Sequence, residues 1–219
     1  MKQKTVFIIS AIVLLLLFAG GSLLYTSQQE KAANQLAETH HSALIRMHSP
    51  TEGRADAPVV IVEFFDPACE TCREFYPMVK QLRAANPDKI RIVLRYAPFH
   101  TGSDKVVAML EAARRQGKFW EALETLLANQ ADWTQHHAAN VESAWGLLGG
   151  IGLNMEQMAQ DINSPEIASI IAQDLADAKT LNVTMTPEFF VNGKPLPSFG
   201  FEQLQGLVEQ ELADSRTRM

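Results

Sequence analysis

Two cysteines three positions apart are the residues of this chain best suited to chemistry. Cys69 and Cys72 are its only cysteines. A disulfide between such near neighbours closes a very small loop, so it restricts the unfolded chain little and adds little stability. On a helix, this spacing places both sulfurs on one face and within bonding reach. We therefore expect the pair to form and break a disulfide as part of a reaction.

The segments around the pair predict where the two thiols lie. Residues 58–65 form an almost continuous apolar run, typical of a strand buried on both faces, and residues 69–85 have helical spacing. Cys69 then begins a helix, where free backbone N–H groups and the helix dipole stabilise a thiolate. Because the thiolate is the form that attacks a disulfide, Cys69 is the predicted nucleophile and Cys72 the predicted resolving thiol.

An acidic residue, Glu63, lies inside the predicted strand, six residues before Cys69. A buried carboxylate without a partner is costly and tends to stay protonated near neutral pH. The alternative is that Glu63 lies at a strand edge and reaches water.

The rest of the chain predicts an α/β domain over residues 57–214. Residues 89–96 alternate as a second strand, so strand, helix and strand form a βαβ unit with parallel strands and a right-handed crossover. An all-helical insertion without a convincing strand follows at about 103–181. Residues 188–192 return to a strand, Asn192-Gly193 predicts a tight hairpin toward 194–196, and residues 201–212 form an amphipathic helix.

The N-terminal part predicts a membrane anchor. Residues 6–25 carry no charge and follow Lys2 and Lys4, so the segment is long enough to cross a bilayer with the N-terminus in the cytoplasm. A cleaved signal peptide is the alternative, although residues 23–25 extend the apolar stretch beyond the small residues at 19–22. We assign 1–26 to the anchor and 27–56 to a stalk and linker, with a weakly amphipathic helix at 27–48 and a turn-rich linker at 49–57.

Charge and histidine placement bear on other classes of function. The net charge is −6 and no long basic run occurs, which argues against a nucleic-acid partner. Half a zinc site at the cysteines would need two further ligands, and the histidines show no matching pair near them, so we expect no metal or organic cofactor. His100 either caps the first inserted helix or lines the site. The histidines are His40, His41, His48, His100, His136 and His137.

Three features resemble known proteins. The stretch FFDPACETCREFYP, with Pro77 eight residues after Cys69, resembles the active-site helix of thioredoxin-fold proteins. The inserted helical block resembles the DsbA-like subgroup of bacterial disulfide oxidoreductases. The stretch TMTPEFFVNGK resembles that subgroup's threonine–cis-proline strand start. The resemblance covers about residues 57–212.

The resemblance implies roles for individual residues. Cys69 would be the nucleophile and Cys72 the resolving thiol, while Glu63 would shuttle protons to the resolving thiol. Pro187 would be a cis-proline that faces the pair, and Thr186 would offer backbone hydrogen bonds to a substrate peptide. Glu70, directly after Cys69, carries a negative charge that opposes the thiolate, so we expect a less oxidising couple than in the most potent DsbA-like enzymes.

The function implied is that of a thiol–disulfide oxidoreductase, an oxidase or isomerase acting on exported cysteine-containing proteins. A membrane redox partner would reset the pair, and the domain would lie on the extracytoplasmic side of a bacterial inner membrane. A membrane-tethered reductase is the nearest alternative. A metal-handling protein and a chaperone are alternatives of other classes.

Overall fold

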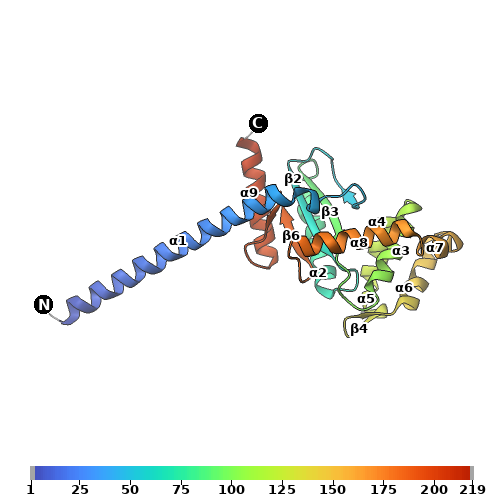
Figure 1. The fold of residues 1–219 in the computed structure, drawn as a ribbon, viewed down its shortest axis with the longest axis horizontal. Helices are drawn as coiled ribbons and strands as arrows, with labels where there is room; N and C mark the ends of the chain where they lie inside the picture. Colours follow the sequence, from blue (N-terminus) through green and yellow to red (C-terminus); the bar gives the residue numbers. More distant parts are fainter. Residues whose placement is uncertain (1–2, 218–219) are drawn as a thin grey trace.

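A long N-terminal helix, α1 (Gln3–Leu44), projects from an α/β domain in the computed structural model, which describes residues 3–217 (Figure 1). The predicted anchor and stalk thus form one uninterrupted helix. The stalk helix was expected to reach residue 48, but α1 ends at Leu44. The reason is tertiary: Leu44 is buried against the sheet, and the chain after it turns to follow the domain.

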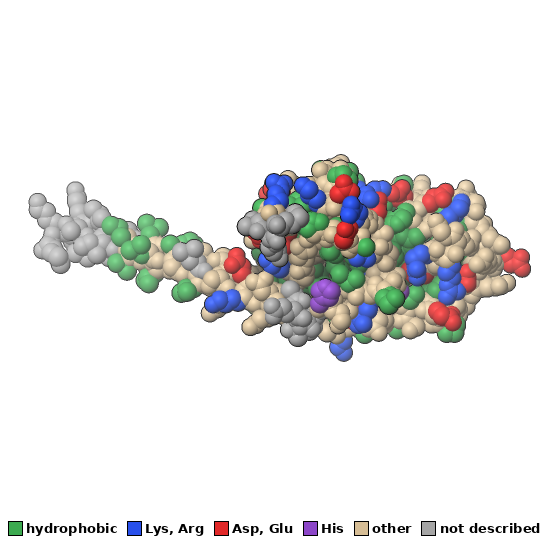
Figure 2. Space-filling view, turned by 90° about the horizontal axis from the view of Figure 1, so that it is seen from above, with side chains coloured by type: hydrophobic (Ala, Val, Ile, Leu, Met, Phe, Trp, Pro, Cys, Tyr) green, Lys and Arg blue, Asp and Glu red, His purple; other side chains and the backbone are tan. Residues whose placement is uncertain are grey.

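From Ile12 to Phe18 the projecting part of α1 exposes large hydrophobic side chains on all sides. Ile12–Gln35 has a mean hydropathy of 1.4, and none of its most apolar window is buried. Figure 2 shows hydrophobic side chains along this rod. Phe18 and Tyr25 are both exposed. A helix that is hydrophobic all round and uncovered by protein is typical of a membrane span. The helix is therefore long and apolar enough to cross a bilayer, as the sequence predicts.

A mixed five-stranded sheet forms the centre of the domain. Its strand order is β1-β3-β2-β6-β7, with β2 parallel to β3 and antiparallel to β6. The parallel pairing confirms the predicted βαβ unit. The central position of β2 explains its continuous apolar sequence, because neighbours cover both of its edges and helices cover both faces. The strands are β1 (Thr51–Glu52), β2 (Val59–Phe65), β3 (Ile90–Tyr96), β6 (Glu188–Val191) and β7 (Lys194–Pro195).

The segment predicted as a turn-rich linker contributes an edge strand. Thr51 and Glu52 pair antiparallel with β3, and the Leu94 N–H donates to the Pro50 carbonyl at 2.9 Å. The sequence predicts a linker at 49–57, and the structure adds two of its residues to the sheet. Two residues carry no recognisable period, so this pairing depends on the free edge of β3 rather than on local pattern.

Alternate residues of β2 face two different hydrophobic layers. Ile61 and Phe65 pack with α2 (Glu70–Ala85) and α9 (Phe201–Thr217), whereas Val62 and Phe64 pack with the end of α1 and with α8 (Pro165–Thr180). Because strand side chains alternate between faces, residue 63 shares the face of α2. The sheet thereby fixes which side of the molecule holds the reactive residues.

The helical insertion follows β3 and packs against the same layer as α2. It contains α3 (Ser103–Arg115), α4 (Phe119–Ala128), α5 (Gln130–Trp133), α6 (Val141–Leu148) and α7 (Met155–Asp161), and it leads into α8. It also contains a short hairpin of β4 (Thr134–Gln135) and β5 (Ala138–Ala139). The expectation that the insertion has no strand was therefore wrong, again because each strand has two residues.

The predicted hairpin after the third long strand is confirmed. β6 and β7 pair antiparallel, and Asn192 and Gly193 form the turn with φ angles of 48° and 83°. Both values lie in the left-handed region that a two-residue type I′ turn requires and that Asn and Gly tolerate.

A buried ion-pair network ties the end of α1 to the domain. Arg95, at 0% exposure, donates to Asp174 at 2.7 Å and to Asp177 at 2.6 Å. Arg46 also binds Asp177 at 2.6 Å, and the His48 ring lies 2.6 Å from Asp174. The segment after α1 is thus held to β3 and α8 by charges that have been taken out of water.

Candidate active site

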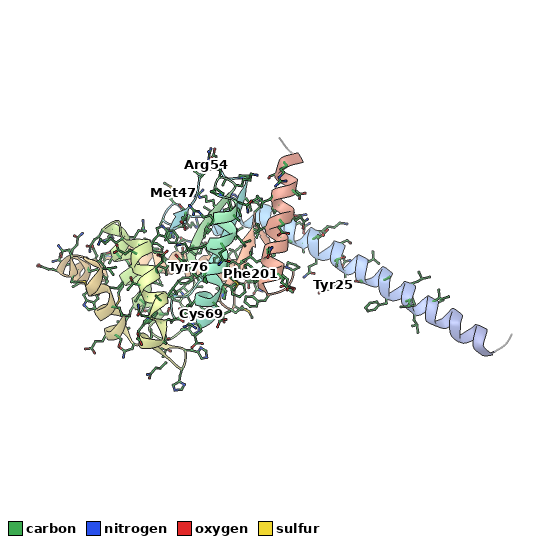
Figure 3. All side chains as sticks on the ribbon, turned by 180° about the vertical axis from the view of Figure 1, so that it is seen from behind. Tyr25, Met47, Arg54, Cys69, Tyr76 and Phe201 are labelled. Atoms are coloured by element: carbon green, nitrogen blue, oxygen red, sulfur yellow. The ribbon has the colours of Figure 1, made fainter. Side chains whose placement is uncertain are left out.

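Cys69 occupies the N-cap of α2, with φ −78° and ψ 120°. Its thiol is 5% exposed and donates to the Thr186 carbonyl across 3.2 Å. Cys72 lies in the first turn of α2 and is completely buried. Both cysteines are free thiols. Figure 3 shows Cys69 at one end of the domain, with Met47 and Arg54 at the opposite end.

The two thiols have opposite acidities. A hydrogen bond from the Cys72 thiol lowers the pKa of Cys69 to about 6, with help from the Cys72 backbone N–H and the nearby charge of His100, while burial opposes the shift. Burial raises the pKa of Cys72 well above its usual value, and the hydrogen bond to Cys69 adds to this shift. At neutral pH the arrangement therefore presents one thiolate, on Cys69, and keeps Cys72 protonated.

Glu63 lies behind the pair in a site closed to water. Its side chain is 1% exposed, and its Oε1 atom has no hydrogen-bond partner. Burial first, and then the charge of Cys69, raise its pKa to about 8. The alternative of an acid at a strand edge is excluded, because β3 and β6 flank Glu63 on β2. Electrostatic coupling to Cys69 and Cys72 places Glu63 with the pair.

Thr186 and Pro187 reach the pair from the loop before β6. The peptide bond between them is cis, as the resemblance implies. The Thr186 carbonyl accepts a hydrogen bond from the Cys69 thiol. Glu63 thus comes from one strand, Cys69 and Cys72 from one helix and its N-cap, and Thr186 and Pro187 from one loop.

Asp66 is a central residue of the site that sequence reasoning did not select. It is fully buried, and its carboxylate accepts from the Ala68 N–H at 2.8 Å and from the Ser103 hydroxyl. The His100 N–H and ring Nδ1 lie 2.9 and 2.7 Å from its other oxygen. Asp66 therefore shapes the turn that delivers Cys69. The Asp-Pro dipeptide between strand and helix is a turn signal, and this role of Asp66 could have been predicted from it.

Gln130 is a second residue that the sequence did not indicate. Its buried side-chain amide donates to the carbonyls of Pro67 and Cys69, at 2.8 and 3.1 Å. These bonds connect α5 of the insertion to the turn before α2. They join residues more than sixty positions apart, and no local pattern announces such a contact.

His100 lines the site. Its side chain binds Asp66, and α3 begins after Gly102 without a side-chain cap. The ring of His137 lies 5.6 Å from the ring of His100, and its Nδ1 is 3.6 Å from the Glu70 carboxylate. Within residues 3–217 as described, no group of three histidine, cysteine or acidic side chains is arranged to hold a metal ion.

Several solved structures share this fold, and one of them is named as an oxidoreductase. A thioredoxin-like oxidoreductase from Silicibacter pomeroyi is 32% identical with a TM-score of 0.67, covering 77% of this chain and 95% of its own. BdbD from Bacillus subtilis is 24% identical with a TM-score of 0.65, covering 76% and 94%. A linker-deletion mutant of ScsC from Proteus mirabilis is 19% identical with a TM-score of 0.68, and the match covers 98% of each chain.

Longer proteins also match in sequence. The Na(+)/H(+) antiporter NhaA of Herminiimonas arsenicoxydans is 30% identical over 167 residues, which are 76% of this chain and 26% of the antiporter. The chain thus spans about a quarter of that relative's length. The family described as "Thioredoxin" matches residues 46–210, which include every residue of the site. This chain belongs to the thioredoxin family and has a DsbA-like fold.

Proposed function

We propose that this chain is a thiol–disulfide oxidoreductase that forms or rearranges disulfides in exported proteins through Cys69 and Cys72. The observation that carries the proposal is the contrast between the two thiols. Cys69 has a lowered pKa and lies beside the cis-proline loop. Cys72 is buried and has a raised pKa. A structural pair would need no such difference.

In the oxidising direction, a substrate thiolate attacks the Cys69 sulfur of the Cys69–Cys72 disulfide. The bond between the cysteines breaks, and Cys72 leaves as a thiolate that takes the proton of Glu63. A second substrate thiolate then attacks the substrate sulfur of the mixed disulfide and expels Cys69. The substrate loses two electrons and the cysteine pair gains them. The low pKa of Cys69 makes it a good leaving group in the second step.

The same groups act in reverse when the pair begins as a dithiol. The Cys69 thiolate attacks a substrate disulfide, and Glu63 as a carboxylate removes the proton of Cys72 so that Cys72 can displace the substrate. This direction serves an isomerase or a reductase. A stabilised Cys69 thiolate favours the reduced form of the pair, which makes an oxidase or isomerase the first candidate and a reductase the second.

The location proposed is the extracytoplasmic side of a bacterial inner membrane, with α1 as a single-pass anchor. Lys2 and Lys4 precede the apolar stretch and favour a cytoplasmic N-terminus. The substrates would be exported proteins with cysteines. Since each turnover changes the redox state of the pair, a membrane redox partner would restore it.

Cysteine variants test the proposal. We expect Cys69→Ser to lose insulin reduction and refolding of a scrambled disulfide substrate. Cys72→Ser should accumulate a mixed disulfide with substrate on Cys69, visible in a non-reducing gel. The double variant should lose both activities. Retention of refolding activity by the double variant would contradict the proposal and favour a chaperone instead.

A further inference from the structure

The turn between β4 and β5 is strained, and it carries two histidines. His136 and His137 have φ angles of 49° and 60°, both in the left-handed region. A two-residue hairpin turn normally places Asn or Gly at these positions, because other side chains meet the backbone there. Strained residues of this kind concentrate at functional sites. We therefore expect the turn to have a functional role in addition to reversing the chain.

The hairpin is fastened to the loop that carries His100. Ala138 forms a bridge with Thr101, and the Ala139 N–H donates to the Thr101 carbonyl at 2.8 Å. These bonds bring the strained turn from the insertion to the loop after β3. They explain how His137 lies against the ring of His100.

The two rings lie between two carboxylates that flank Cys69 in sequence. His100 binds the buried Asp66 at 2.7 Å, and His137 lies 3.6 Å from Glu70. The four side chains form a continuous row of contacts from the turn before Cys69 to the residue after it. His137 is 69% exposed and Glu70 is 50% exposed, so this end of the row faces solvent.

Acidic groups also lie on the other elements at this end of the sheet. Glu63 on β2 and the Cys72 thiol on α2 lie behind the sulfur. Glu188 on β6 follows Pro187 and is partly buried. The charge of His100 favours the Cys69 thiolate, whereas His137 contacts His100 and the Glu70 carboxylate.

We infer that His100 and His137 are positioning residues that set the reduction potential of the Cys69–Cys72 couple. His100 places positive charge near Cys69, and His137 pairs with the Glu70 carboxylate next to it. This inference rests on the proposed exchange reaction. Positive imidazoles stabilise the thiolate and hence the reduced pair, which makes the couple more oxidising.

Three asparagine variants of the full chain test the inference. His100→Asn keeps a donor for Asp66 and removes the charge. His137→Asn keeps the turn, because Asn tolerates the left-handed region. His136→Asn is the matched control, since it changes the same strained turn at the neighbouring histidine. The measurements are the pH dependence of Cys69 alkylation by iodoacetamide and the reduction potential against glutathione at pH 6 and pH 8.

We expect His100→Asn to reduce the thiolate fraction of Cys69 at pH 5 by about tenfold, which corresponds to one pKa unit. His137→Asn should reduce it by roughly threefold, a smaller effect because its exposed charge is screened by water. His136→Asn should match the wild type. His100→Asn and His137→Asn should both lower the reduction potential relative to the wild type, at pH 6 and at pH 8. Thiolate fractions and potentials of His100→Asn and His137→Asn that equal those of the control would overturn the inference.

The alkylation readout separates this inference from the proposed function. It measures Cys69 without any catalysed exchange. A wild-type protein that fails to exchange disulfides would refute the proposed function, whatever the histidine variants show. An active wild type whose Cys69 is unaffected by both substitutions would refute the inference alone.

Discussion

The pKa values of the two thiols differ because Cys69 lies at the end of α2 and Cys72, three residues further along, lies in the apolar core. Cys69 is at the open end of α2, where the Cys72 thiol and a backbone N–H stabilise its negative charge. Cys72, one turn further along, is surrounded by the apolar layer between α2 and the sheet. A thiolate there would lose its hydration with little in return. The attacking and resolving roles thus follow from depth, not from residue type.

Glu63 makes the stability of the reduced protein depend on pH. Its pKa is about 8 in the folded state and 4.5 by ordinary reference, so the folded protein holds a proton that the unfolded chain releases. The free energy of unfolding should therefore fall as pH rises between these values, by a few kcal/mol in total. Urea unfolding of Glu63→Gln, which cannot titrate, should lack this component.

The informative quantity is the difference in unfolding free energy between Glu63→Gln and the wild type. From pH 5 to pH 8, the unfolding free energy of the variant should rise relative to that of the wild type. The variant should also slow the step in which Cys72 gains or loses its proton. A difference that stays constant over this range would show that Glu63 is not held protonated by burial.

The ion-pair network is the element-scale feature with the clearest energetic consequence. Arg95 joins β3 to α8 through Asp174 and Asp177, and all three side chains are nearly inaccessible to water. Arg95→Met should cost about 3–5 kcal/mol of unfolding free energy, because it leaves carboxylates buried without their partner. Chemical denaturation of the full chain in detergent measures this loss.

Arg54→Met is the matched control for that substitution. Arg54 pairs with Asp56 at 2.7 Å, but both side chains are largely exposed. Water screens such a pair, so the denaturation midpoint should stay at the wild-type value. Equal losses for the two methionine variants would mean that the buried network does not hold the end of α1 to the domain.

Elements with a long pattern were predictable, and those that depend on a distant partner were not. Local sequence patterns predict the apolar strand β2, the alternating strand β3 and the Asn192-Gly193 turn. The two-residue strands β1, β4 and β5 do not, because they exist only through the edge to which each is paired. The site divides in the same way. The cysteine motif and the Thr-Pro strand start could be predicted from the sequence. Gln130 and His137 could not, because only tertiary contacts bring them from the insertion to the site.

The whole molecule combines a projecting helix with a domain that holds the helix at one end. Near Leu44 the helix is buried and fixed by the ion-pair network. Further toward the N-terminus, a groove of about 550 Å³ lies between α1 on one side and β7, α9 and their connecting segment on the other, with Ala33, Pro195 and Leu207 among its lining residues. The reactive cysteines do not line this groove. The apolar rod and the redox site are thus separate parts of the molecule.

Membrane orientation can be tested with the chain's own cysteines. If α1 is the anchor and the domain lies outside the cytoplasm, a membrane-impermeant maleimide should label Cys69 in intact cells with a permeabilised outer envelope, once the cysteine pair has been reduced. The protein should also remain in the membrane pellet after carbonate washing. Labelling that requires lysis of the inner membrane would place the domain in the cytoplasm and contradict the proposed location.

The central claim is that Cys69 is ionised at neutral pH while Cys72 is not. The rate of alkylation of the reduced wild-type protein, followed by mass spectrometry from pH 4 to pH 10, tests it most directly. We predict one modified residue, Cys69, with an inflection near pH 6, and no comparable reaction at Cys72. An inflection near the ordinary thiol value of 9.0, or equal rates at both cysteines, would contradict the account.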